Sequence, residues 1–289
     1  MLPATVTTQH PGSVTDVTAQ AATKRRTHAR YPHSVSITVQ EIAAALAAQD
    51  DELASLLAGR REDDWQLPSP CEGWTVADVV LHVAQTNELA IASVEGTFPD
   101  FAMNLAGGDA APGNVDDAAA VAVERERGAP TDDLFERWKT AADRFLELAR
   151  ATDLHTRVTW VTGQLSVHTL VATRLSETWI HTTDVADALG VTLAPSDRLR
   201  HVARLAWRTL PYAFARSGRE LTGAVAFELR SPTGAAWDFA PDEQAVTTVR
   251  GEGAELCLVA ARRLQPAQTS LRAEGPDADT VLDLVRTYA

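Results

Sequence analysis

No apolar run in the 289-residue sequence approaches the ~20 consecutive residues that a membrane-spanning helix needs. The N-terminus also lacks the apolar segment of a secretory signal. These two absences argue against an integral membrane protein and against a secreted one. They predict a cytoplasmic protein that does not work at a membrane.

Cysteine is scarce as well. The only two, Cys71 and Cys257, lie far apart and match no metal-ligand spacing such as C-x-x-C. The sequence leaves a disulfide between them open. Two unpaired thiols in a reducing cytosol are the prediction, because disulfides are rare in that compartment.

Basic residues are fewer than acidic ones, 26 against 39, which gives a formal net charge of −13. An acidic surface repels the phosphate backbone of nucleic acids. We therefore expect small-molecule partners and no nucleic acid. The first thirty residues run against this trend, because they carry Lys24, Arg25, Arg26 and Arg30 against Asp16.

The remaining composition is globular, with 45% hydrophobic residues, which is enough apolar surface for a core. The length suggests two domains. Residues 1–35 are the exception, because they are rich in Thr, Ala, Gln and Ser and have no periodic apolar pattern. They are predicted to be a disordered tail, with a basic arm for a partner as the alternative.

Residues 36–192 carry apolar residues at helical spacing. Helices are predicted in four segments: from Ile37 to Gly59, from Thr75, from Thr131, and from about Ser166 to Leu189. Thr75 and Asp78 have the form of a capping box at the second of these. The segment 97–118, rich in Pro and Gly, is expected to be a long loop, and 157–163 a short non-helical link. Four helices with long connections predict a four-helix bundle.

The pattern changes in residues 193–289. Helices are predicted at 197–216, 252–263 and 276–287. Short strands are predicted at 223–230, 235–240 and 245–250, with Gly234 in the first turn. This part therefore indicates a small α+β domain, and the fold class of the whole chain is α+β.

One pair of residues points to chemistry. Glu177 and His181 lie four residues apart, so they share one face of the fourth predicted helix and their side chains can reach one ion. Three protein ligands and a water form the usual catalytic zinc site. His82, in the second predicted helix, is the natural third ligand.

A plainer interpretation of the same helix stays open. Glu177 and His181 lie more than about 100° away from the apolar stripe of the helix. That stripe is marked by Leu175, Trp179 and Ala186. The polar side also holds Arg174 and Asp184, so it could be an ordinary solvated face. If a metal is bound, these two could instead orient Glu177 or His181.

Two longer motifs resemble those of the mycothiol-dependent maleylpyruvate isomerase family, within the DinB-like superfamily of metal-binding helical bundles. The motifs are Trp65-x-x-Pro68-Ser-Pro-Cys-Glu-Gly73-Trp74-Thr-Val-x-Asp78-x-x-x-His82 and Arg174-Leu-x-Glu177-Thr-Trp179-x-His181-x-x-Asp184-Val-Ala-Asp187. Further segments, around 199–203, 231–237 and 249–263, resemble an actinobacterial subgroup of metal-binding proteins. The resemblance covers about residues 40–289.

The resemblance implies a DinB-like bundle followed by a sterol-carrier-like domain. It implies that His82, Glu177 and His181 bind Zn²⁺ or another divalent metal. It also implies that an arginine of the C-terminal domain reaches the site as a catalytic residue. Arg262 and Arg263 both occupy the comparable stretch, and the alternative is that both lie on the surface.

The predicted function is therefore a metal-dependent enzyme that uses a low-molecular-weight thiol, such as mycothiol. It would isomerise or S-conjugate a small electrophilic substrate, whose carboxylate an arginine would clamp. One alternative is a hydrolase or dehydratase that uses metal hydroxide and no thiol. The other is a non-catalytic protein that binds a metal or a small ligand.

The other candidates are expected to be structural. Trp160 is predicted to pack in the core or under a loop, with a pocket wall as the alternative. His168 is expected near the start of its helix as a cap-region or surface residue. His155 and His201 are expected to have structural roles.

Overall fold

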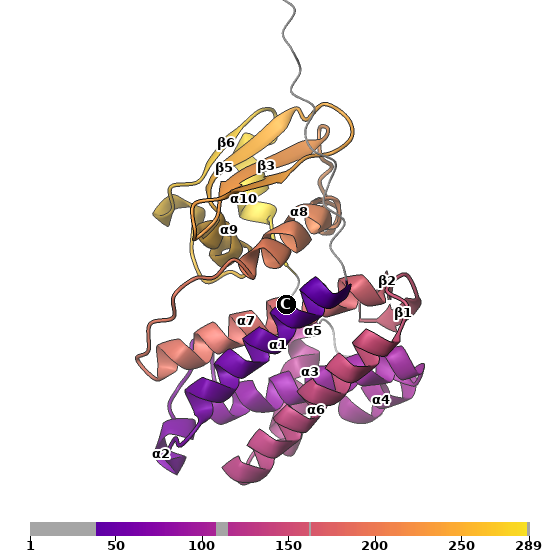
Figure 1. Ribbon diagram of the computed structural model, residues 1–289, viewed down its shortest axis with the longest axis vertical. Helices are drawn as coiled ribbons and strands as arrows, with labels where there is room; N and C mark the ends of the chain where they lie inside the picture. The colour runs from indigo at the N-terminus through magenta and orange to yellow at the C-terminus, as the bar shows by residue number, and fades with distance from the viewer. Residues whose placement is uncertain (1–38, 108–114, 162, 288–289) are drawn as a thin grey trace, which may run out of the picture. The chain divides into compact units, whose positions relative to one another are not determined.

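Four long helices form a bundle in the N-terminal part of the computed structural model, which describes residues 39–107, 115–161 and 163–287. They are α1 (Val39–Leu57), α3 (Val76–Glu95), α6 (Thr131–Ala151) and α7 (Val167–Ala188). Both α1 and α3 pack against α6 and α7, which closes the bundle (Figure 1). The predicted four-helix bundle is therefore confirmed.

Helix α7 is buried on every side, which contradicts the expectation of a solvated polar face. Arg174 and Asp184 are fully buried, and Glu177 and His181 are 6% and 5% exposed. The reason is that α7 packs against α1, α3 and also α8 (Leu199–Arg216), which covers it from the C-terminal half of the chain. The polar residues of α7 therefore face protein, and each of them must be paired or bind a ligand.

The predicted capping box at the start of α3 is confirmed. The hydroxyl of Thr75 accepts a hydrogen bond from the backbone N–H of Asp78 at 3.3 Å. The carboxylate of Asp78 accepts from the backbone N–H of Thr75 at 2.9 Å and from Arg127 Nε at 2.9 Å. These contacts fix where α3 begins, six residues before His82.

Replacing Thr75 by alanine is expected to lower the free energy of unfolding by about 1 kcal/mol, because the helix loses its N-cap acceptor. Urea denaturation would measure the change. Thr75→Ser is the matched control, since it keeps the hydroxyl and should cost less than about 0.5 kcal/mol. Equal destabilisation by both variants would contradict a role for the cap.

The segment predicted as a long loop, 97–118, contains helix instead. Helix α4 (Phe98–Leu105) lies before residues 108–114, which are outside the described part, and α5 (Val115–Glu126) follows them. Pro99 misled the prediction, because it stands in the first turn of α4, where its missing N–H is not needed. A further short helix, α2 (Glu62–Trp65), was also not predicted.

The predicted link near residue 160 is a β-hairpin of β1 (Arg157–Trp160) and β2 (Gly163–Ser166), paired antiparallel. Trp160 is 8% exposed, and its ring lies 5.7 Å from that of Phe98 between centroids. Its predicted packing role is confirmed.

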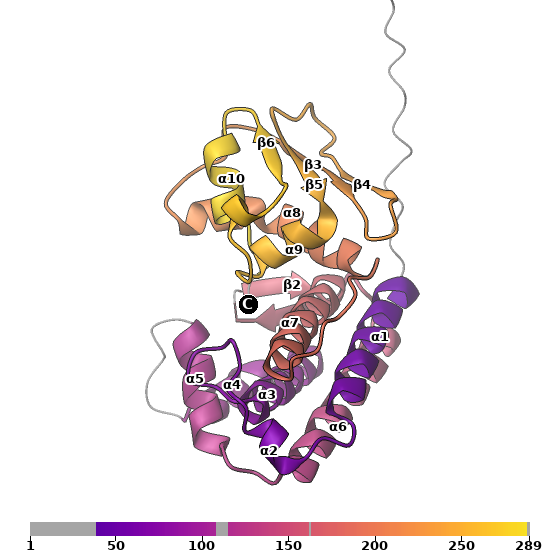
Figure 2. The same ribbon diagram turned by 90° about the vertical axis from the view of Figure 1, so that its left-hand side faces the viewer.

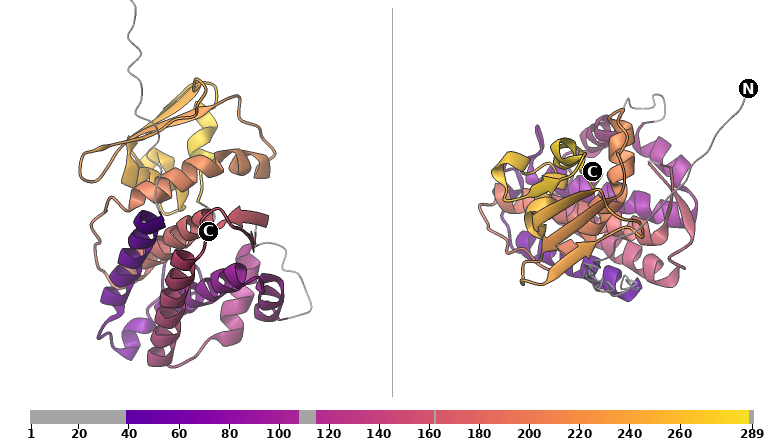
Figure 3. Two further views of the ribbon diagram at one scale, coloured as in Figure 1. Left: turned by 45° about the vertical axis from the view of Figure 1, so that its right-hand side comes forward. Right: turned by 90° about the horizontal axis from the view of Figure 1, so that it is seen from above.

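The C-terminal part is a four-stranded sheet with helices on one face (Figures 2 and 3). The strand order is β4-β3-β5-β6. The strands are β3 (Val225–Arg230), β4 (Ala236–Phe239), β5 (Thr247–Glu252) and β6 (Arg272–Glu274). The helices after α8 are α9 (Gly253–Ala260), the 3-10 turn η1 (Pro266–Gln268) and α10 (Ala278–Leu284).

The three predicted strands are present, and the α+β class is confirmed. Gly234 has a φ of 89° in the β3–β4 turn, a conformation that glycine adopts at no steric cost. The sequence pattern did not predict β6 or the parallel pairing of β3 with β5. Parallel strands meet through a long connection, so local patterns carry little information on their pairing.

Residues from Ile37 onward form one compact unit, so the division at residues 192 and 193 stays a prediction. The predicted tail, 1–35, lies outside the described residues. Cys71 and Cys257 are both free, as expected. None of the helices in the described part is long and apolar enough to cross a membrane.

Candidate metal centre

Three side chains from two helices converge inside the bundle. His82 comes from α3, and Glu177 and His181 come from α7. Oε2 of Glu177 lies 3.8 Å from Nε2 of His82 and 3.7 Å from Nε2 of His181. These separations exceed a direct hydrogen bond, so the three atoms face one another across a small gap. The structure brings together the ligand set expected from sequence.

The gap has the size of a metal ion. Ligands at ~2.1 Å from a tetrahedral ion lie about 3.4 Å apart, close to the observed separations. Two buried atoms of the set, Oε1 of Glu177 and Nδ1 of His82, have no hydrogen-bond partner. Buried polar atoms are costly without a partner, and a cation would offset that cost for the carboxylate. The residues therefore fit a divalent metal held by two imidazoles and one carboxylate.

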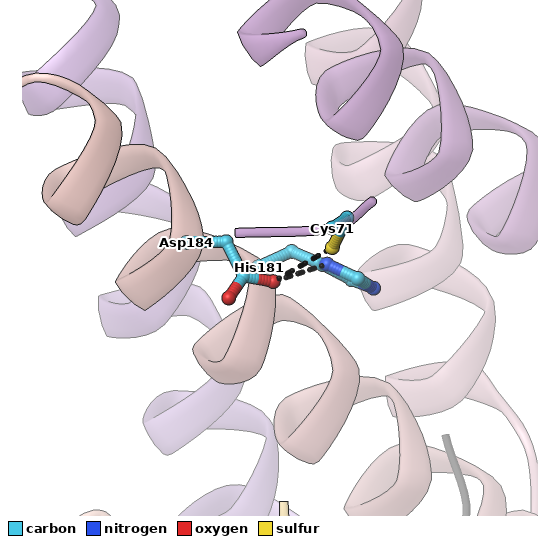
Figure 4. Close-up of side chains that lie close together, drawn as sticks. All are labelled: Cys71, His181 and Asp184. Atoms are coloured by element: carbon cyan, nitrogen blue, oxygen red, sulfur yellow. Dashed lines mark hydrogen bonds and ion pairs between the residues drawn. The ribbon is translucent and has the colours of Figure 1, made fainter. Parts of the chain in front are cut away.

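Asp184 fixes the orientation of His181. Its Oδ2 lies 3.0 Å from Nδ1 of His181, so Nδ1–H donates to the carboxylate and Nε2 is the ring nitrogen that faces Glu177 (Figure 4). The thiol of Cys71 lies 3.2 Å from the same oxygen. Cys71, His181 and Asp184 also have metal-ligand spacing. Oδ2 of Asp184 is better suited to hydrogen bonding than to metal ligation, because it already accepts a hydrogen bond from His181.

Glu177 and His82 are held in the protonation states that ligate a metal. Although burial opposes ionisation, the facing imidazoles of His181 and His82 and the charge of Arg174 lower the pKa of Glu177 to about 2. Burial lowers the pKa of His82, so its ring is held neutral. A carboxylate and a neutral imidazole are the protonation states that bind metals.

Of the two candidate arginines, Arg263 reaches this site and Arg262 does not. Arg263 donates from Nε and Nη2 to the two oxygens of Asp184, at 2.6 and 2.7 Å, as a bidentate pair. Although burial opposes it, this pair and His181 hold the pKa of Asp184 well below its usual range. Arg262 is exposed and donates to the backbone oxygen of Asp283.

The sequence interpretation missed two contributors. Cys71 was expected to be an idle thiol, but it lies against Asp184 and within 3.6 Å of Arg263 Nη2. The ring of Trp74 packs on that of His82 with centroids 5.1 Å apart. Both residues stand in the first of the two motifs, which was the available signal.

Trp74 also lines a cleft of about 570 Å³. Its other lining residues, from the loop before α3, from α5 and just after it, are Glu72, Gly73, Ala120, Val121, Glu124, Arg125 and Arg127. Trp74 therefore connects the wall of this cleft with His82, one of the candidate ligands.

Two further ionisable groups, Arg174 of α7 and Asp50 of α1, are buried in the bundle. Arg174 donates from Nε to Oδ1 of Asn87, and both its Nη atoms are buried without a hydrogen bond. It acts on Glu177 through charge and not through a hydrogen bond. Asp50 of α1 is 3% exposed, and burial raises its pKa to about 7 against the opposing charge of Arg174.

Asp50 is therefore expected to make stability fall as the pH rises from about 4 to about 7. Over that range the folded protein binds more protons than the unfolded chain, so the free energy of unfolding decreases with pH. Asp50→Asn should flatten this dependence, as measured by urea denaturation at pH 5, 6, 7 and 8. Asp63→Asn, at an exposed position of α2, is the control and should leave the slope unchanged.

The chain matches one protein family and resembles two mycobacterial proteins. A family model described as the mycothiol maleylpyruvate isomerase N-terminal domain matches residues 46–186. Proteins described as uncharacterized in two strains of Mycobacterium tuberculosis are each 33% identical over 251 residues, which is 85% of this chain and 94% of theirs.

Solved structures share the fold. Crystal structures of a mycothiol-dependent maleylpyruvate isomerase and of one of its mutants each superpose with a TM-score of 0.55. They are 19% and 18% identical in sequence, and the match covers 84% of this chain and 96% of theirs.

Proposed function

Because the chain belongs to the mycothiol maleylpyruvate isomerase family, we propose that it is a divalent-metal enzyme that uses a low-molecular-weight thiol such as mycothiol. It would isomerise or S-conjugate a small electrophilic acid. The observation that carries this proposal is the meeting of His82, Glu177 and His181 around one gap.

His82, Glu177 and His181 would hold the metal, and zinc is the proposed ion because two imidazoles and a carboxylate are a common catalytic zinc set. Such an ion, when bound, lowers the pKa of a thiol or water at its open position. Nickel, manganese and iron also accept this donor set. The thiol and the substrate would enter through the cleft beside Trp74.

The chain's own residues prepare the site. Asp184 keeps the proton of His181 on Nδ1, which leaves Nε2 free for ligation. Arg263 donates from Nε and Nη2 to the carboxylate of Asp184, and from Nη1 to the backbone oxygen of Ala261. We therefore assign Arg263 first to holding Asp184. To bind a substrate carboxylate directly with the same two nitrogens, Arg263 would have to break its hydrogen bonds to Asp184.

Thiol dependence tests the proposal. The protein, loaded with zinc, would be assayed with maleylpyruvate and with a thiol-reactive electrophile, each with and without mycothiol. We expect turnover that requires the thiol and is lost in Glu177→Gln. Turnover that is unchanged without thiol would favour a metal-hydroxide hydrolase or dehydratase. No turnover despite stoichiometric metal would favour a non-catalytic binding protein.

A further inference from the structure

A cluster of basic side chains lies where α8 crosses the N-terminal half of α7. Arg200, Arg204 and Arg208 follow one another at intervals of four residues, so they share one face of α8. His201 lies beside them, and His168 stands in the first turn of α7. Helices α7 and α8 pack against each other, and the charges of Arg204 and Arg208 lower the pKa of His168, after the larger effect of burial.

The cluster lacks compensating partners within the part of the chain that the structure describes. The side chains of Arg204, Arg208, His168 and His201 make no hydrogen bond or ion pair there. Nε of Arg204 and Nδ1 of His201 are shielded from solvent and still have no partner. Among the main charges that act on these groups, the one acid is Glu41, which raises the pKa of His201.

Other arginines of the chain contrast with this cluster. Arg198, two residues before Arg200, donates to Glu52 at 2.8 Å, and Arg137 in α6 pairs with Glu88 at 2.7 Å. Arg200, at the end of the cluster, is engaged with the ring of Phe239 at 6.0 Å. Like charges four residues apart on a helix destabilise it when nothing lies between them. The chain has 13 more acidic than basic residues, and yet no acidic side chain of the described residues forms an ion pair with Arg204 or Arg208.

We propose that this cluster binds a phosphate or diphosphate group, with Arg204 and Arg208 as the charged donors and His168 and His201 beside them. Arginine offers a planar fork that matches phosphate oxygens, and several arginines on one face favour a multiply charged anion. The group could be free diphosphate or part of a phosphorylated small molecule.

This site is separate from the metal centre. His168 and His181 are 13 residues apart on α7, which corresponds to about 20 Å along the helix. A ligand on the basic cluster would therefore not contact Glu177 or His82. The proposal does not depend on the thiol-dependent reaction, and its test needs no turnover.

Calorimetric titration of the full-length protein tests the site. The probes are inorganic phosphate, sodium diphosphate and a sugar phosphate, at an ionic strength held constant with sodium chloride. We expect saturable binding of diphosphate or the sugar phosphate, weakened about tenfold or more in Arg204→Gln/Arg208→Gln. Arg216→Gln/Arg219→Gln is the matched control, because it removes the same charge beyond the cluster and should bind as the parent does.

Stability without ligand gives a second readout. The double variant in the cluster should unfold at the same or a higher temperature than the parent, because like-charge repulsion is removed. Should Arg204→Gln fail to fold, Arg208→Gln alone, at an exposed position, should still weaken binding. The proposal is overturned if the parent binds none of the probes at millimolar concentration, or if the cluster variant binds unchanged. Equal binding of citrate would overturn the assignment to phosphate.

Discussion

Glu177→Gln is expected to lose the bound metal while the fold persists. Oε2 of Glu177 is the atom that both imidazoles face, at 3.7 and 3.8 Å, so it is the centre of the ligand set. The amide keeps the size of the side chain and removes its charge. Changes to residues that only support metal ligands cost 10- to 100-fold in affinity, so loss of a direct ligand should cost more than about 100-fold.

Elemental analysis after dialysis and competition with a chromophoric chelator would measure metal content and affinity. We expect about one zinc per chain in the parent and almost none in Glu177→Gln or His82→Ala. Asp187→Asn is the control, because it removes an exposed carboxylate from the same helix and should keep the metal. A parent that binds no divalent metal after reconstitution would remove the basis of the proposed enzyme.

Stability separates loss of ligation from misfolding. Without metal, the ionised carboxylate of Glu177 is stabilised by the facing imidazoles and by the charge of Arg174, so the apo variant should be less stable than the apo parent but should still fold. Added zinc should raise the melting temperature of the parent and not that of Glu177→Gln. A variant that does not fold with or without zinc would instead indicate that Glu177 acts in packing.

The bundle helices were predictable because their signals are local. Thr75 and Asp78 mark the start of α3 within four residues, and helical periodicity marks its continuation. The sequence pattern did not predict α4 and α5, and the cause is also local. The Pro and Gly residues near 99–113 outweighed the short helical patterns beside them. Turn-forming residues restrict where a helix can lie, but Pro is allowed in a first turn.

The burial of the α7 face that carries Glu177 and His181 was not predictable from the periodicity of that helix. Glu177 and His181 lie off the apolar stripe and would be solvated on an isolated amphipathic helix. They are buried because α7 packs against α1, α3 and α8, which a pattern within α7 alone does not show. The family resemblance supplied what periodicity could not, since it connects His82 with residues 95 and 99 positions later.

The choice between Arg262 and Arg263 also needed the structure. The two follow α9, and Arg262 has a φ of 61°, a left-handed conformation that is uncommon for residues other than glycine. The chain turns there, and the two side chains reach different partners, the backbone of Asp283 and the carboxylate of Asp184. No sequence pattern distinguishes two adjacent arginines in this way.

Arg263→Met is expected to destabilise the protein by about 3 kcal/mol, because it leaves the fully buried Asp184 without its bidentate partner. Removing one partner of a buried ion pair is costly because the other charge stays buried. The Arg263 side chain is 27% exposed, which places the effect at the lower end of that range. Urea denaturation would measure it. Arg262→Met, at the exposed neighbour, should cost less than about 1 kcal/mol.

A double-mutant cycle with Asp184→Asn tests whether the two residues act as a pair. The double variant should be less destabilised than the sum of the single variants, since no buried charge is left unpaired. Zinc affinity should fall about 10-fold or more in Asp184→Asn, because His181 loses its orienting acceptor. If Arg263 only clamps substrate, Arg263→Met would raise KM and leave stability and zinc affinity unchanged. Additive stability changes would likewise show that Arg263 does not act through Asp184.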